Sequence, residues 1–170
     1  MSAQLFCLTL ALMGDTFGTL PAERIELACE VAEHLIETVE QYDIEPSVFA
    51  GLIFYESRWR VNAVSHAGAC GLTQVLERYA DETCEELFDP IVSITIGARK
   101  LDRWSRMTVR DENGRRRVPR PGGIHEALAC YNVGHACLTS ASATNYADRV
   151  MTYARHFDQT AAGIETCQEH

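Results

Sequence analysis

A glutamate at the end of an apolar stretch is the residue of this chain best suited to acid–base chemistry. Glu56 follows Ile53 by three residues and Leu52 by four, so a helix over residues 46–57 places its carboxyl group on an apolar face. An apolar environment disfavours the charged carboxylate, and the negative end of the helix dipole adds to this effect. Both raise the pKa of Glu56, and a carboxylic acid that stays protonated near neutral pH can act as a general acid.

Taken alone, Glu56 fits better as a solvent-facing glutamate at a frayed helix end, because most glutamates of folded proteins are exposed. The residues that follow it favour a functional interpretation. Glu56-Ser57 ends the apolar stretch, and the next segment carries, in order, Asn62, Ser65, Gly68, Ala69, Gly71, Leu72, Thr73 and Gln74. A third group, Cys130-Tyr131-Asn132-Val133-Gly134, comes much later. Three short motifs in order are far more specific than any one of them.

These motifs resemble those of the soluble lytic transglycosylase family, whose catalytic domain has a goose-type-lysozyme-like fold. The family has a Glu-Ser pair, then the pattern Asn-x-x-x-Ser-x-x-Gly-Ala-x-Gly-Leu-Met-Gln, then Ala-Tyr-Asn-x-Gly. This chain departs from the pattern at Thr73, where methionine is usual, and at Cys130, where alanine is usual. The resemblance covers residues 45–157 and includes Tyr146-Ala147 in the last predicted helix.

The resemblance implies a role for each matching residue. Glu56 is the catalytic acid and base, Gln74 hydrogen-bonds the substrate near it, and Tyr131 lies by the reacting sugar. The other implied roles are these: Tyr146 binds substrate, Ser57 orients Glu56 or caps the helix, Asn132 fixes a turn or binds an acetamido group, and Ser65, Gly68 and Gly71 shape the loop under the sugar. The ordinary alternatives are a surface glutamine for Gln74 and a half-buried core aromatic for Tyr131.

The family's reaction cleaves the β-1,4 bond between N-acetylmuramic acid and N-acetylglucosamine in peptidoglycan with a single carboxylate. By this resemblance Glu56 protonates the glycosidic oxygen and then takes the proton of the C6 hydroxyl, so that a 1,6-anhydromuramic end forms. Two alternatives stay open. A lysozyme-type hydrolase needs a second carboxylate, for which Glu77 and Asp81 are the nearest candidates. An inactive glycan-binding or structural module of a phage particle or secretion machine would account for Thr73 and Cys130.

Seven cysteines in a chain of 170 residues indicate an oxidising compartment, and their odd number leaves at least one thiol unpaired. We expect Cys70 to pair with Cys84 and Cys130 with Cys137, because each pair would close a loop beside the motifs. A zinc site from Cys130, His135 and Cys137 is the competing idea, although it lacks a paired Cys-x-x-Cys element and a clear fourth ligand. We therefore expect no metal and no cofactor.

Helical periodicity predicts an all-α, single lysozyme-like domain that positions these residues. The expected helices cover residues 24–39, 46–57, 73–80, 89–104, 124–131 and 145–157, and a turn-rich loop or small hairpin covers residues 107–123. A length of 170 residues suits one domain. We assign residues 1–20 to an N-terminal segment and residues 21–170 to the catalytic domain, with the family match over residues 45–157.

Charge and hydropathy limit the classes of binding partner and the compartment in which the protein can act. The net charge of −9 argues against a nucleic-acid binder. Six arginines, at positions 106, 110, 115, 116, 117 and 120, we interpret as solvated surface, with acidic stem peptides or an acidic partner as the alternative. The apolar run Leu5–Gly14 is too short to span a membrane and has no basic residue before it, which favours a buried helix or strand over a secretory signal. We expect the protein to act in the periplasm or cell wall, with carriage in a phage virion as an option.

Overall fold

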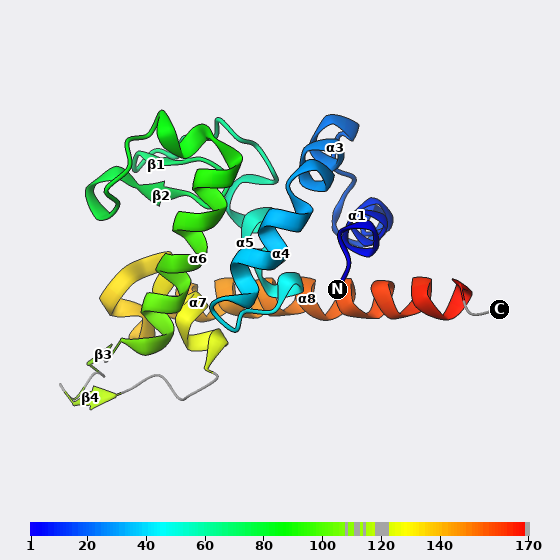
Figure 1. The fold of residues 1–170 in the computed structure, drawn as a ribbon. Helices are drawn as coiled ribbons and strands as arrows, with labels where there is room; N and C mark the ends of the chain where they lie inside the picture. The colour runs from blue at the N-terminus through cyan, green and yellow to red at the C-terminus, as the bar shows by residue number, and fades with distance from the viewer. Residues whose placement is uncertain (108, 111–112, 114, 118–122, 169–170) are drawn as a thin grey trace.

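The centre of the fold is a helix, α5 (Pro46–Ser57), that is buried on nearly all sides. Residues 47–54 are all buried, as expected of a helix that is apolar all round. Pro46 stands in its first turn, where the missing amide proton costs little. The computed structural model describes residues 1–107, 109–110, 113, 115–117 and 123–168 (Figure 1). The helices over residues 32–40 and 141–168 pack against α5.

The N-terminal part of the chain forms four helices: α1 (Ala3–Leu12), α2 (Gly14–Phe17), α3 (Ala22–Glu30) and α4 (Ala32–Glu40). Helix α1 packs against α3, α4 and α8, and its Phe6 and Leu10 side chains are buried in the main core. A disulfide between Cys7 and Cys29 joins α1 to α3. The apolar run near the N-terminus therefore lies largely in a helix that contributes to this core.

The single helix predicted over residues 24–39 is wrong, because the chain bends at Val31. The backbone of Val31 has φ −99° and ψ 1°, which ends α3 and begins α4. The bend changes the direction of the chain between α3 and α4. Both helices pack on α1, and α4 packs in addition on α5 and α6. Periodicity alone shows one apolar stripe and does not reveal such a change of direction.

Three helices complete the frame: α6 (Pro90–Arg106), α7 (Ile124–Val133) and α8 (Ala141–Gln168), with a 3-10 segment η3 (Gly134–Thr139) between the last two. Asp89 caps α6, because its carboxylate accepts hydrogen bonds from the amides of Ile91 and Val92. Helix α8 is longer than the predicted 145–157 and runs below α5 and α1 in Figure 1. It packs against α5, α7 and α1. Helix α6 packs against α4 and α7.

A small lobe follows α5 and replaces the helix predicted over residues 73–80. Its elements are β1 (Ala69–Cys70), β2 (Val75–Leu76) and two 3-10 turns, η1 (Glu77–Tyr79) and η2 (Glu86–Phe88). The strands are antiparallel, with Cys70 opposite Val75. The predicted helix is wrong because residues 75–76 pair with β1 and because Gln74 has a positive φ of 50°. Cys70, Val75, Leu87 and Ile96 form a separate small core under this lobe.

The turn-rich segment 107–123 contains a hairpin in the part that the structure describes. Strands β3 (Val109–Arg110) and β4 (Arg116–Arg117) pair antiparallel, whereas residues 108, 111–112, 114 and 118–122, and with them Arg120, lie outside the described residues. Arg106 forms an ion pair with Asp102 at 2.7 Å. Helices dominate the described residues, so the predicted all-α class is confirmed. Within that part of the chain, no helix has both the length and the apolarity that a bilayer crossing requires.

Candidate active site

Glu56 lies in the last turn of α5 and faces a tyrosine from α8. Its side chain is half-buried, and its Oε1 accepts a hydrogen bond of 2.6 Å from the Tyr146 hydroxyl. Helix α5 ends directly afterwards, because Arg58 adopts the left-handed conformation. The packing of α5 on α8 therefore joins two residues that lie 90 positions apart in the sequence.

The surroundings of Glu56 favour its protonated form. Burial raises the pKa of Glu56 from an ordinary 4.5 to about 7, while the Tyr146 hydrogen bond and the positive charge of Lys100 act in the opposite direction. A pKa near 7 lets one carboxyl group donate a proton and later accept one at neutral pH. The environment of Glu56 is therefore compatible with acid–base chemistry at neutral pH.

Tyr131 approaches the same place from α7. It is buried, and its hydroxyl donates a hydrogen bond of 2.8 Å to the carbonyl oxygen of Thr73. Burial and the nearby Glu56 carboxylate raise its pKa well above the ordinary value. Tyr131 therefore stays a neutral phenol whose hydroxyl is fixed to the small lobe.

The structure adds Lys100, which the sequence reasoning missed. Its ammonium lies 4.1 Å from the centre of the Tyr131 ring and interacts with the Glu56 carboxylate. Two signals were present in the sequence. Lys100 is the only lysine of the chain, and it shares a face of α6 with Ser93 and Gly97, both of which are buried. Small buried residues on a helix face indicate close packing, so a charged residue in the same row is unusual.

The loop after α5 is held by hydrogen bonds among its own residues. Ser65 accepts from the Ala69 amide through its hydroxyl at 3.0 Å and donates its own amide to the Ala69 carbonyl oxygen. Gly68 has a φ of +81°. Gly71 has a φ of +77°, and a Cβ atom there would lie 2.1 Å from the carbonyl oxygen of Leu87. Only glycine fits at position 71, because conformation and space both exclude a side chain.

Gln74 braces this loop from inside. Its side-chain amide donates to the carbonyl oxygens of Ala63 and Gly71 at 3.0 and 2.9 Å. These two bonds occupy both donor hydrogens of the amide group, so its oxygen is the atom left for a further partner. Gln74 therefore supports the backbone that passes beside Tyr131 and Thr73.

Ser57 and Asn132, two further predicted site residues, do not contact Glu56 through their side chains. The buried Ser57 hydroxyl donates to the carbonyl oxygen of Ile53 at 3.3 Å, within the same helix. Asn132 is exposed in the last turn of α7, and its side chain has no hydrogen-bond partner among the described residues. The structure thus brings together Glu56, Tyr131 and Tyr146.

Thr73, which replaces the methionine usual in the family pattern, fits against small residues of α6. The Thr73 hydroxyl donates to the Ser93 carbonyl oxygen at 2.8 Å, and its amide donates to the Ser93 hydroxyl at 3.2 Å. Thr73 also packs against Gly97, where a Cβ atom would lie 2.5 Å from the threonine side chain. A buried threonine is therefore fully hydrogen-bonded here, which a buried hydroxyl requires.

The departure at Cys130 creates a disulfide with Cys137 that spans the end of α7. A second disulfide joins Cys70 of β1 to Cys84, beside the loop. The structure thus contains both expected pairs, and Cys167 has a free, exposed thiol. The zinc site from Cys130, His135 and Cys137 is not formed, because Cys130 and Cys137 are joined in a disulfide. Within the described residues no group of three or more acidic, histidine or cysteine side chains is placed to hold a metal ion.

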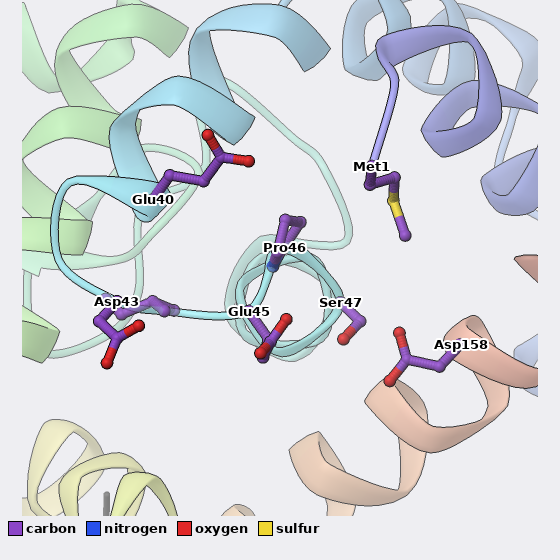
Figure 2. Close-up of a pocket in the computed structure, with 8 residues that line it drawn as sticks. Met1, Glu40, Asp43, Glu45, Pro46, Ser47 and Asp158 are labelled. Atoms are coloured by element: carbon purple, nitrogen blue, oxygen red, sulfur yellow. The ribbon is translucent and has the colours of Figure 1, made fainter.

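A separate hollow lies at the other end of α5, roughly 15 Å from Glu56 along the helix. Its volume is about 220 Å³, and four carboxylates surround the first turn of α5 there: Glu40, Asp43, Glu45 and Asp158 (Figure 2). None of the predicted site residues lines it. Glu45, which directly precedes α5, and Glu56, in its last turn, thus lie at opposite ends of this helix.

The sequence profile of the transglycosylase SLT domain matches residues 33–152, which include Glu56, Lys100, Tyr131 and Tyr146. The chain belongs to this family. The resemblance inferred from the three motifs is thereby confirmed. This SLT domain is similar to membrane-bound lytic murein transglycosylase F 2 of Alkalilimnicola ehrlichii, with 32% identity over 110 residues, which cover 64% of this chain and 23% of that protein.

The SLT domain also has a solved structural relative. The structure of an inactive glutamate-to-glutamine mutant of the lytic transglycosylase Slt from Pseudomonas aeruginosa superimposes with a TM-score of 0.62. The superposition covers 94% of this chain and 31% of that one, at 17% identity, and shows a shared fold. The chain spans less than a third of the length of either relative.

Proposed function

We propose that this SLT domain cleaves peptidoglycan glycan strands as a lytic transglycosylase, with Glu56 as the sole acid and base. The observation that carries the proposal is the half-buried Glu56 carboxyl group, which accepts the Tyr146 hydrogen bond and has a pKa of about 7. A relative that covers the domain is named a lytic murein transglycosylase. A solved structure of similar fold is described as inactive after one glutamate became glutamine.

The proposed reaction begins with proton donation. Protonated Glu56 gives its proton to the glycosidic oxygen between N-acetylmuramic acid and N-acetylglucosamine, and the bond from that oxygen to C1 breaks. The 2-acetamido oxygen stabilises the positive charge at C1. The Glu56 carboxylate, held by the Tyr146 hydroxyl, then removes the C6 hydroxyl proton while O6 attacks C1. The product is a 1,6-anhydromuramic end, Glu56 regains its proton, and no water is consumed.

The groups around Glu56 favour this route over hydrolysis. Most glycosidases use two carboxylates. In the described part of the chain, the groups that act on Glu56 are hydroxyl and ammonium groups. Of the two acidic residues considered as a second carboxylate, Glu77 accepts the Cys84 amide at 2.8 Å, and Asp81 is exposed in the small lobe.

The test is a digestion of purified peptidoglycan followed by mass spectrometry of the released fragments. Wild type and Glu56→Gln would be compared with Glu45→Gln, the same substitution at the exposed start of the same helix. The proposal expects fragments one water molecule lighter than hydrolytic products from wild type and from Glu45→Gln. It expects none from Glu56→Gln.

Two other results would contradict the proposal in different ways. Reducing muramic ends would make the domain a lysozyme-type hydrolase. Binding to peptidoglycan without release by wild type would make it an inactive glycan-binding module. Circular dichroism of Glu56→Gln separates loss of chemistry from loss of folding.

The substrate and the disulfides together indicate where the domain works. Peptidoglycan lies outside the cytoplasmic membrane, and three disulfides form in an oxidising compartment. We therefore place the activity in the periplasm or cell wall. Carriage in a phage particle or secretion machine stays a prediction, as do a substrate contact by Asn132 and a partner for the arginine-rich segment.

A further inference from the structure

Lys100 reaches the acid–base site from α6. Its half-buried side chain places the ammonium 4.1 Å from the centre of the Tyr131 ring. The same ammonium and the Glu56 carboxylate attract each other. Glu56 is thus hydrogen-bonded to the Tyr146 hydroxyl of α8. It also lies in the electric field of the Lys100 ammonium of α6.

The position of the ammonium is fixed by packing on two elements. The Tyr131 hydroxyl is held by the Thr73 carbonyl oxygen at 2.8 Å, so the ring cannot turn away. Thr73 in turn packs on Gly97, one turn before Lys100 on α6. An ammonium over the face of a fixed aromatic ring is attracted by the ring's electrons. Ring and helix together hold the charge near Glu56.

Several other charged groups on or beside the packed helices have partners of their own. Arg99 pairs with Glu82 at 3.6 Å, Arg106 with Asp102 at 2.7 Å, His125 with Asp148 at 2.8 Å, and Arg149 lies over the Tyr55 ring. On the α4 side of α6, His34 bonds to Thr95 and Thr38. The groups that face Glu56 from the packed helices are therefore Lys100, Tyr131 and Tyr146. Among them Lys100 is the cation.

The proposed reaction needs Glu56 in two forms. It must be an acid when the glycosidic bond breaks and a carboxylate when the C6 hydroxyl loses its proton. Burial removes water from Glu56 and therefore disfavours its charged carboxylate form relative to the neutral acid. A nearby cation corrects this imbalance, because it stabilises the charged form only.

We propose that Lys100 is a positioning residue for the second half of the reaction, in which its ammonium stabilises the Glu56 carboxylate so that this group can act as the base. The inference rests on the proposed transglycosylase function. It assigns the only lysine of the chain to the acid–base pair, a role that none of the three motifs contains.

The first test is the pH dependence of peptidoglycan cleavage by Lys100→Gln and Lys100→Arg. Activity of wild type falls as Glu56 loses its proton. Lys100→Gln raises the pKa of Glu56, so this alkaline fall moves to higher pH while activity at the optimum decreases. The ratio of activity at alkaline to acidic pH should rise about twofold or more in Lys100→Gln. Lys100→Arg keeps the charge and should keep the wild-type ratio, whereas a purely structural role would lower activity without moving the profile.

The second test does not depend on activity. Because the chain has one lysine, labelling with carbon-13 lysine gives a single side-chain signal, whose titration by NMR reports Lys100 directly. Burial lowers the pKa of Lys100 and the Glu56 carboxylate counteracts this, so Glu56→Gln should lower it further. Glu45→Gln should leave the titration unchanged, since Glu45 lies at the far end of α5.

The outcomes separate the two proposals. A Lys100 titration that is identical in wild type and Glu56→Gln would overturn the pairing, even if wild type cleaves peptidoglycan. An altered titration together with no cleavage by wild type would overturn the transglycosylase function and with it the role of Lys100 in the reaction. An altered titration together with the shifted pH profile would support both.

Discussion

Replacing Glu56 by glutamine should make the protein more stable at neutral and alkaline pH. Glu56 has a pKa of about 7 in the folded chain against an ordinary 4.5, so the folded state holds this proton more tightly than the unfolded state. As pH rises from 4.5 to 7, unfolding releases a proton and the free energy of unfolding decreases. Glutamine cannot titrate and still accepts a hydrogen bond from Tyr146, so the variant escapes this loss.

The size of the effect follows from the same values. At about 1.4 kcal/mol per pH unit, the rise from 4.5 to about 7 corresponds to about 3 kcal/mol, and partial exposure of the side chain reduces this figure. Below about pH 4.5 the two proteins should differ least, because Glu56 is protonated in both states. Above pH 7 the variant should gain the full amount. For a domain of this size 1 kcal/mol shifts the melting temperature by about 2–4 °C, so the gain is readily measured.

The assay is reversible urea unfolding of wild type and Glu56→Gln with all disulfides oxidised, from about pH 4 to pH 8. The informative quantity is how the stability difference between the two proteins changes with pH. Glu45→Gln serves as the matched control, because it makes the same substitution at an exposed side chain at the far end of α5. A stability difference for Glu56→Gln that stays constant over this range would refute the raised pKa, and with it the argument for Glu56 as a general acid.

Three further substitutions test the frame around Glu56. Gly71→Ala should destabilise the fold by about 3 kcal/mol in thermal unfolding, because the new methyl group meets a backbone oxygen at a positive φ; a loss below about 1 kcal/mol would contradict the described loop. The double change Cys130→Ala and Cys137→Ala should cost about 2 kcal/mol and lower peptidoglycan cleavage, and wild-type stability would argue against this disulfide. Tyr146→Phe should lower the rate at the pH optimum about tenfold and move the alkaline fall to higher pH, because a charge-assisted hydrogen bond to Glu56 is lost; an unchanged profile would show that the 2.6 Å contact has no part in the reaction.

Local chemistry made much of the site predictable. Leu52 and Ile53 showed that Glu56 would lie on an apolar face, and the structure places it at the end of a buried helix. Asp89-Pro90 marked the start of α6, where the Asp89 side chain caps the first turn. In both cases the interacting residues lie within a few positions of each other, so a short stretch of sequence is enough to predict the feature.

The remaining features depend on contacts between distant segments. The charge of Lys100 acts on Glu56 only because α6 and α5 are brought near each other by packing on α7 and α8, and no spacing in the chain encodes that approach. The segment after Gln74 has the composition of a short helix, but pairing with β1 makes it a strand. Val31 continues an apolar stripe, yet the chain bends there, and α4 packs on α5 and α6 as well as on α1. Tertiary packing overrides local preference at these positions.

The three disulfides have one property in common that bears on how the protein is made. Every bridge joins a cysteine to the next cysteine along the chain: Cys7 to Cys29, Cys70 to Cys84, and Cys130 to Cys137. A polypeptide that enters an oxidising compartment from its N-terminus therefore presents both partners of one bridge before the first sulfur of the next arrives. Oxidation in simple order of emergence yields the native set, and no exchange between bridges is required. Export and correct pairing are thus compatible without an isomerase, which is a consequence of connectivity alone.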